Sequence, residues 1–86
     1  MKITDIKINI VAEVKVKAYV SIVLDNCFLI NGLRIIDRPA GLFVAMPGKK
    51  QKNGACQDIV HPLNRETREM IEDLILDEYE RMLDRL

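Results

Sequence analysis

The stretch GLFVAMPGKKQKNG, residues 41–54, passes from an apolar segment directly into a basic one. Its apolar residues at positions 42–46 would fill both faces of a β-sheet, because successive side chains of a strand point to opposite sides. This pattern indicates a central strand. Pro47 cannot donate a hydrogen bond to a neighbouring strand, so we expect the strand to end at the proline and a loop to follow.

A hairpin is predicted around the dipeptide Asn53-Gly54, which favours a tight type I′ turn. The strand of residues 41–46 would form its first half, and a short strand of residues 56–60 would return beside it. The sheet should end at Pro62, since proline holds the preceding residue extended and lacks the N–H group. The loop between the two strands would therefore have a rigid support.

Three lysines within four positions give this loop its charge: Lys49, Lys50 and Lys52. Lysines so close together can neutralise neighbouring phosphates of a nucleic acid, although an ammonium group contributes affinity more than base recognition. Gln51 and Asn53 add hydrogen-bonding groups that can reach base edges. These five residues are the candidate nucleic-acid-binding site. A loop that only increases solubility explains the same charges equally well.

Three more strands are predicted before this stretch. Apolar residues at alternate positions indicate strands at residues 6–10 and 14–24, and residues 27–36 are expected to form the third. In the second, even-numbered positions are apolar and odd-numbered positions 15–21 carry lysine, Tyr19 or serine, so one face should be solvated. Asp25-Asn26 supplies the turn after it, and Gly32 marks a bulge in the third strand. Residues 37–41, DRPAG, are expected to form a connecting loop.

An amphipathic helix is predicted after the sheet, because apolar residues recur there at spacings of three and four. They are Met70, Ile71, Leu74, Ile75, Tyr79, Met82, Leu83 and Leu86. Asn64 suits the N-cap, and Glu66 and Glu69 suit the positive end of the helix. The apolar stripe should cover the apolar face of the sheet. We therefore predict one α+β domain, residues 1–86, with a small antiparallel sheet of about five strands and one C-terminal helix.

The chain is small for a stable domain, since a protein of 86 residues buries only about 60–65% of its unfolded surface. Association with a second subunit would add stability. The composition, 49% apolar but only 5% aromatic, describes an aliphatic core. No apolar run is long enough to span a bilayer, and the first ten residues do not resemble a signal peptide. We expect a cytoplasmic protein with no membrane partner.

The net charge of zero hides an uneven distribution of charged residues. Residues 1–63 carry nine basic against five acidic side chains, a net charge of +4. Residues 64–86 carry four basic against eight acidic side chains, a net charge of −4. A polyanion would be attracted to the first part and repelled by most of the second.

The residues offer no convergent set for catalysis or for binding a metal or cofactor. His61 is the only histidine, and with Cys27 and Cys56 it would make an incomplete zinc site, so we expect it to order the turn before the helix. The two cysteines indicate buried thiols and not a disulfide. Asp73 and Asp77 stand one helical turn apart, but on the polar face. We predict a protein that is not an enzyme, with no cofactor, metal or small-molecule substrate.

Two separated motifs resemble the SpoVG (stage V sporulation protein G) family: GLFVAMP with the basic pair after it, and DIVHPLN at residues 58–64. The likeness extends back through residues 24–25 and the RIID of residues 34–37. It implies a homodimer with a small antiparallel sheet and a C-terminal helix. It also implies a regulator that binds nucleic acid and affects gene expression, septation and, in spore formers, sporulation. The family's basic pair falls on Lys49 and Lys50, although arginine is frequent at the second position.

We interpret the chain as a homodimer that binds DNA, or alternatively RNA, through the lysine loop. An open sheet has unpaired edges, and pairing one edge with that of a second copy would satisfy them. Accessory contacts to nucleic acid are expected from Lys15, Lys17, Arg34 or Arg38. The alternative is a module of the division or sporulation machinery that binds another protein through the acidic helix or a sheet edge.

Overall fold

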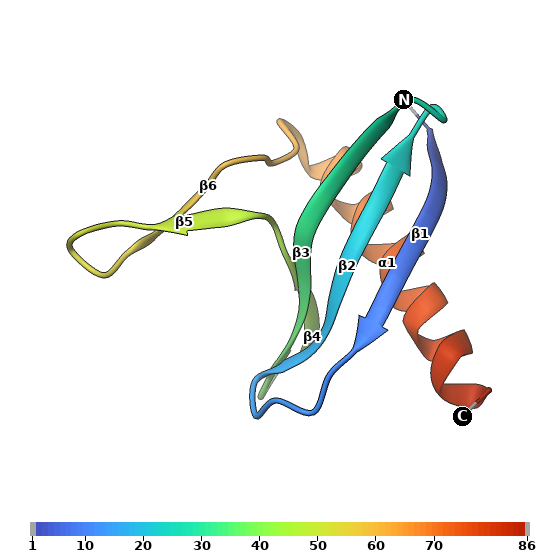
Figure 1. The fold of residues 1–86 in the computed structure, drawn as a ribbon, viewed down its shortest axis with the longest axis horizontal. Helices are drawn as coiled ribbons and strands as arrows, with labels where there is room; N and C mark the ends of the chain where they lie inside the picture. Colours follow the sequence, from blue (N-terminus) through green and yellow to red (C-terminus); the bar gives the residue numbers. More distant parts are fainter. Residues whose placement is uncertain (1, 86) are drawn as a thin grey trace.

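Four antiparallel strands, joined in chain order, form the main sheet of the protein (Figure 1). A computed structural model describes residues 2–85, apart from the side chain of Cys56. The main strands are β1 (Ile3–Ile10), β2 (Val16–Leu24), β3 (Phe28–Arg38) and β4 (Gly41–Ala45). Two short strands, β5 (Gly48–Lys50) and β6 (Cys56–Asp58), form a second sheet, and helix α1 (Arg65–Asp84) follows. The predicted α+β class with one C-terminal helix is confirmed.

A tight turn connects β2 and β3 at the predicted dipeptide. Asp25 and Asn26 have φ angles of 49° and 56°, and the Cys27 N–H donates to the Leu24 carbonyl at 3.0 Å. Two consecutive positive φ values are typical of a type I′ turn, and Asp and Asn tolerate them better than most residues. The twist of such a turn matches that of the strands, which explains why β2 and β3 pair directly beside the turn.

A bulge interrupts β3 at the predicted glycine. In the register of β2 and β3, Ser21 stands opposite two residues, Asn31 and Gly32. Gly32 has a φ angle of +88°, which residues with a side chain rarely adopt. An added Cβ would also lie 3.6 Å from the Cβ of Pro47, so the bulge packs against the point where β4 ends.

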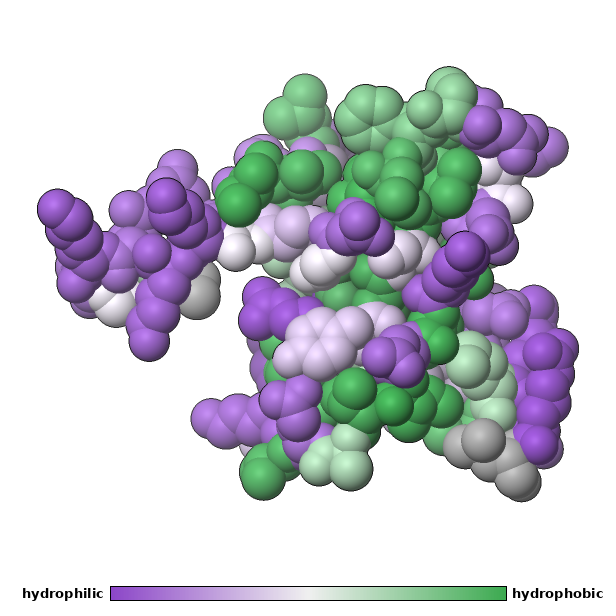
Figure 2. Space-filling view, in the orientation of Figure 1, coloured by the Kyte–Doolittle hydropathy of each residue, from purple (hydrophilic) through white to green (hydrophobic). Residues whose placement is uncertain are grey.

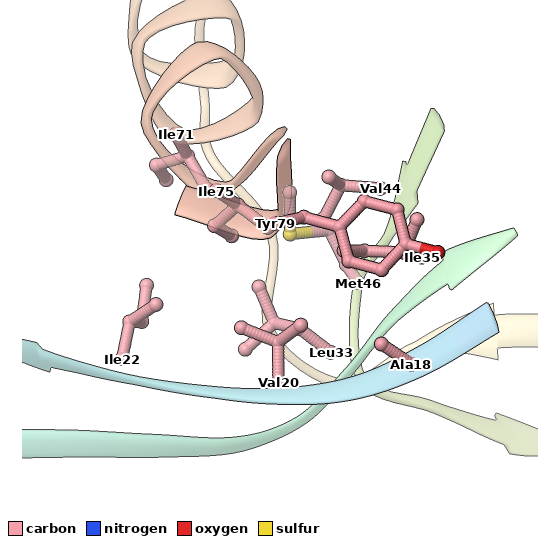
Figure 3. Close-up of a cluster of buried hydrophobic side chains, with 10 residues drawn as sticks. All are labelled: Ala18, Val20, Ile22, Leu33, Ile35, Val44, Met46, Ile71, Ile75 and Tyr79. Atoms are coloured by element: carbon pink, nitrogen blue, oxygen red, sulfur yellow. The ribbon is translucent and has the colours of Figure 1, made fainter. Parts of the chain in front are cut away.

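The inner face of the main sheet packs against α1, as the sequence predicted (Figure 3). Alternate residues of the strands supply one side of this core, and residues one helical turn apart supply the other. The buried set is Ala18, Val20, Ile22, Leu33, Ile35, Val44 and Met46 from the sheet side, with Ile71, Ile75 and Tyr79 from the helix. Each large aliphatic side chain contributes roughly 1.5–3 kcal/mol when fully buried, so this contact stabilises the body of the protein.

Two side-chain hydrogen bonds fix α1 at its start and against the sheet. Asn64, the predicted N-cap, accepts a hydrogen bond through Oδ1 from the N–H of Thr67 at 2.8 Å. Glu72 accepts one from the backbone N–H of Val44 at 3.1 Å. The prediction that residues 41–46 form a central strand is wrong, because β4 lies at the edge of the main sheet. A helix carboxylate here takes the place that a further strand would occupy.

Three predicted boundaries in the main sheet are wrong. Strand β1 begins at Ile3 and not at residue 6. Val14 is 91% exposed and precedes β2, because the chain bends at residues 14–15 as it turns from β1 into β2. Residues 37–41 do not form an open loop. Strand β3 continues to Arg38, which pairs with Gly41 across a two-residue turn.

The helix stripe and the cysteines also differ in part from the predictions. Leu74 is 41% exposed because it lies over the edge of the sheet at β1, and Leu83 is exposed in the last turn. Leu86 lies outside the described residues. Cys27 is free and exposed, not buried, since it follows a turn at the end of the sheet. The side chain of Cys56 is outside the described part of the chain.

Candidate nucleic-acid interface

The candidate lysines lie on a hairpin that projects from the body of the protein (Figure 1). Strands β5 and β6 pair only with each other. The prediction that residues 56–60 return beside residues 41–46 is therefore wrong. Pro47 explains the difference, because it ends β4 and redirects the chain before pairing resumes at Gly48. The lysine segment itself supplies the first strand of the hairpin.

Backbone contacts hold the base of the hairpin. The carbonyl of Pro47 accepts hydrogen bonds from the N–H groups of Ile59 at 2.7 Å and Val60 at 3.4 Å. A Cβ added at Gly48 would lie only 3.0 Å from the carbonyl oxygen of Gln57. Glycine at this position therefore allows the two strands to approach closely where the hairpin leaves the body.

The tip of the hairpin is a three-residue loop and not the predicted type I′ turn. The Gln51 N–H donates to the Ala55 carbonyl at 2.7 Å, and the Gly54 N–H donates to the Gln51 carbonyl at 3.0 Å. Gly54 has a φ angle of +88°, but Asn53 does not have the positive φ that a type I′ turn requires. Asn53 Oδ1 instead accepts a hydrogen bond from the Ala55 N–H at 3.1 Å, which stabilises the longer loop.

The three lysines are exposed and leave the hairpin in different directions. Lys49 and Lys50 are neighbours in β5, so their side chains emerge on opposite faces. Lys52 stands in the loop at the tip. The predicted loop conformation is thus right for Lys52 and wrong for the other two. Figure 2 shows the result, a projection covered by hydrophilic side chains.

Gln51 and Asn53 take part in hydrogen bonds within the hairpin. Gln51 Nε2 donates to Oε1 of Gln57 on the opposite strand. Asn53 uses its side-chain oxygen for the loop contact with Ala55. The structure therefore brings all five candidate residues together on one hairpin. The side chains of Gln51 and Asn53, however, form hydrogen bonds that stabilise the hairpin itself. Their contact with base edges stays a prediction.

In the part of the chain that the structure describes, carboxylates do not form ion pairs with the lysines of the hairpin. Among residues 2–85, the ion pairs are Lys17 with Asp37 on the main sheet and two pairs within α1. None of them includes a residue of the hairpin. These ammonium groups are thus free to interact with an anionic partner.

The predicted accessory residues lie on the main sheet and not on the hairpin. Arg34 stands opposite Tyr19 of β2. The guanidinium carbon of Arg38 lies 3.6 Å from the centroid of the Phe43 ring. Lys17 forms its 4.0 Å ion pair near the same end of the sheet. The arginines belong to the face that points away from α1, as do both aromatic rings.

Tyr19 and Phe43 were not predicted from the sequence as functional residues. The available signal was strand alternation: Tyr19 stands between the buried residues Ala18 and Val20, and Phe43 precedes the buried Val44, which places both on the face that the helix leaves open. A hydrogen bond with Glu13 raises the pKa of Tyr19, as do partial burial and the charge of Glu13, whereas Arg34 lowers it. Tyr19 is therefore surrounded by both an acidic and a basic side chain.

The part of the chain that the structure describes has neither a cluster of metal-ligating side chains nor a helix that could cross a membrane. No group of three or more His, Cys, Asp or Glu side chains is placed to hold a metal ion there. His61 Nδ1 lies 3.0 Å from the carbonyl oxygen of Pro62, inside the turn that leads to α1. No helix in residues 2–85 combines the length and apolarity needed to cross a bilayer. The non-enzymatic nature and the cytoplasmic location stay predictions.

Known proteins similar to this chain share one family. The SpoVG family model matches residues 1–81. A protein of Bdellovibrio bacteriovorus is 58% identical over 83 residues, which cover 96% of this chain and 77% of that protein. Proteins of Myxococcus xanthus and Clostridium perfringens are 54% and 48% identical, with 84% and 92% of their own lengths covered. Each of the three is named "Putative septation protein SpoVG".

Proposed function

Because this chain belongs to the SpoVG family, we propose that it is a regulatory protein that binds DNA, or alternatively RNA, through the β5–β6 hairpin. Septation, with sporulation in spore formers, is the process it would regulate, in keeping with the name of its relatives. One observation carries the proposal. Three exposed lysines without ion-pair partners among the described residues stand on a hairpin that projects from the body.

The shape of the hairpin supports duplex DNA as the partner. The major groove is about 12 Å wide and admits a two-stranded ribbon, whose strands lie about 4.8 Å apart. Lys49 and Lys50 emerge on opposite faces of the ribbon. If the hairpin enters the groove tip first, each of these lysines faces one of the two phosphate backbones that border it. Lys52 at the tip then points toward the floor of the groove.

The salt dependence of binding tests the hairpin as the binding site. We would measure fluorescence anisotropy of labelled duplex DNA and single-stranded RNA over a series of salt concentrations. The K49A/K50A/K52A variant should bind more weakly, and its slope of log affinity against log salt should be shallower by up to about 0.9 for each lost phosphate contact with duplex DNA.

A matched control separates the hairpin from overall charge. The R65A/R68A/R81A variant removes the same positive charge from α1, where alanine maintains the helix. It should bind as the wild-type protein does. Equal losses in the two variants would mean that only net charge matters. If the wild-type protein bound neither ligand at moderate salt, the proposal would fail and the protein-binding alternative would replace it.

We also propose that two copies associate through the apolar end of the molecule, where β2 ends and β3 begins. Phe28 and Leu29 are exposed there, beside an apolar cavity of about 210 Å³. The cavity lining includes Leu24, Val60 and Pro62. A projecting aromatic ring beside an apolar cavity suits an isologous dimer, in which each copy supplies both features.

Sedimentation equilibrium tests this association. The wild-type protein should sediment with twice the 9.9 kDa mass of the chain, and Phe28→Ser should shift it toward the monomer. Val14→Ser is the matched control, because Val14 is also exposed but lies outside the apolar end. A wild-type mass near 9.9 kDa at concentrations that support DNA binding would overturn the proposal.

A further inference from the structure

The outer face of the main sheet, on the side away from α1, is not covered by any element of residues 2–85 (Figure 1). Figure 2 views the molecule from this side and shows apolar groups interspersed with hydrophilic ones. One row of side chains crosses all four strands of this face. In the register of the sheet it consists of Asn9, Tyr19, Arg34 and Ala45.

Two pairs of planar side chains on this face, each an aromatic ring with an arginine, have surface that is exposed to solvent. Tyr19 is 40% exposed, and Arg34 lies beside it on the neighbouring strand. The guanidinium carbon of Arg38 lies over the ring of Phe43, and Arg38 is exposed to solvent. Aromatic rings and guanidinium planes are the groups on which proteins stack unpaired nucleic-acid bases. We call these four residues the outer platform.

The spacing of the outer platform suits a flexible strand. Arg34 faces Tyr19 on one side and Ala45 on the other, and Phe43 lies two residues from Ala45. With about 4.8 Å between strands and about 3.3 Å per residue, Tyr19 and Phe43 are roughly 12 Å apart. A single strand can place different bases on the two groups. A duplex cannot, because its bases are stacked inside the helix.

The charges around the outer platform favour an anionic ligand. Lys7 adds a third cation to the two arginines on the same face, and none of the three forms an ion pair among the described residues. The nearby acids are partly engaged. Asp37 pairs with Lys17, and Glu13 interacts with the hydroxyl group of Tyr19. Asp5 lies near Lys7 on the same face and forms no ion pair among the described residues, so a phosphate chain that crosses the sheet would meet three unpaired cations against this one unpaired carboxylate.

We propose that the outer platform binds the unpaired bases of a single-stranded nucleic acid, with stacking on Tyr19 and on the Arg38–Phe43 pair. This inference rests on the proposed function in that the ligand is nucleic acid, but it uses a different surface and a different interaction. The hairpin contacts phosphates, whereas the outer platform contacts bases. The two sites therefore prefer different ligands, duplex for the hairpin and single strand for the platform.

Intrinsic fluorescence gives a direct measurement of stacking. The chain has two tyrosines and no tryptophan, and Tyr79 is only 6% exposed in the core. Titration with a twelve-residue oligothymidylate should therefore quench the fluorescence of Tyr19. An abasic strand of the same length carries the same phosphates without bases, and it should leave the fluorescence unchanged.

Two substitutions at Tyr19 form the matched pair of variants. Tyr19→Val removes the ring but suits a β-strand, and should weaken binding of the oligothymidylate by about 5- to 150-fold. Tyr19→Phe keeps the ring and should retain the affinity measured by anisotropy. Binding of the abasic strand should be the same in both variants and in the wild-type protein. Thermal unfolding followed by circular dichroism would establish that both variants are folded.

The outcomes separate this inference from the proposed function. If the wild-type protein and Tyr19→Val each bind the oligothymidylate and the abasic strand with equal affinity, and no quenching occurs, the outer platform does not stack bases. The hairpin can still bind duplex DNA in that case. If K49A/K50A/K52A binds duplex as wild type does but quenching persists, the hairpin proposal fails and the platform remains. If Tyr19→Val instead dissociates a dimer and no strand quenches, this face binds a second copy of the chain, and the inference is overturned.

Discussion

The body of the protein and the β5–β6 hairpin are built by different interactions. In the body, side chains of the main sheet and α1 bury one another, and ten of them form a continuous core. In the hairpin, every residue with a described side chain from 48 to 58 is exposed, and hydrogen bonds of the backbone and of two amide side chains hold the strands together. Packing therefore determines stability in one region, whereas the other can present charge without contributing to the core.

The largest loss of stability should follow when a core residue is truncated. Ile75→Ala removes a side chain that is 0% exposed, and should lower the free energy of unfolding by about 2–5 kcal/mol through lost burial and a cavity. Leu74→Ala, on the neighbouring residue with partial exposure, should cost clearly less. Urea denaturation of the two variants makes the comparison. Equal losses would show that the helix contact does not stabilise the body as described.

Two glycines with the same backbone angle test the two regions under equal strain. Gly32 in the body and Gly54 in the hairpin both have a φ angle of +88°, where alanine costs roughly 1–2 kcal/mol. Gly32→Ala should lower the global stability by this amount. Gly54→Ala should leave global unfolding unchanged and accelerate amide hydrogen exchange only in the hairpin. A matching loss of global stability in Gly54→Ala would mean that the hairpin unfolds together with the core.

Removal of the N-cap at the start of α1 should cause an intermediate loss of stability. Asn64→Ala removes the acceptor of the Thr67 N–H and should cost about 1 kcal/mol, measured as a lower midpoint of thermal unfolding. Asn64→Asp is the control, because aspartate also accepts this hydrogen bond and should retain the wild-type midpoint. A midpoint that falls equally in both variants would contradict the role of the cap.

The smallest effect on stability should come from the lysines. K49A/K50A/K52A should change the free energy of unfolding by less than about 0.5 kcal/mol, since exposed side chains away from packing contacts contribute little. Denaturation curves of this variant and of wild type should superimpose even where DNA binding differs. A larger loss would mean that the lysines stabilise the hairpin or the body, and their effect on binding would then need to be separated from folding.

Strands β1 and β2 could be predicted because their apolar residues alternate and because one face is buried, whereas β3 and β4 were recognised as apolar runs bounded by turn residues. The type I′ turn at Asp25-Asn26 and the cap at Asn64 could also be predicted, since each depends on the chemistry of one or two adjacent residues. These features share a local cause. Val14 follows the same alternation but lies outside β2, because the bend between strands depends on how β1 and β2 are connected.

The hairpin was predicted less well because its geometry depends on register. The lysine cluster could be recognised as a candidate site because its lysines are close together in the sequence. The sequence did not show that Lys49 and Lys50 lie in a strand that pairs with β6. The preference of Asn53-Gly54 for a type I′ turn was overridden by a loop one residue longer. The bond between Gln51 and Gln57 likewise requires the final alignment of the strands. A single sequence does not specify which of two adjacent registers is adopted.

The hydrogen bond from Val44 to Glu72 has a consequence for the order of events during synthesis. Helix α1 follows all six strands in the chain, so a growing polypeptide on the ribosome displays the apolar face of its sheet and the edge of β4 before Glu72 has been added. Such surfaces pair readily with those of other unfinished chains. Newly made protein is therefore expected to be most vulnerable to aggregation just before α1 emerges, and a chaperone that binds nascent chains would be needed most at that moment.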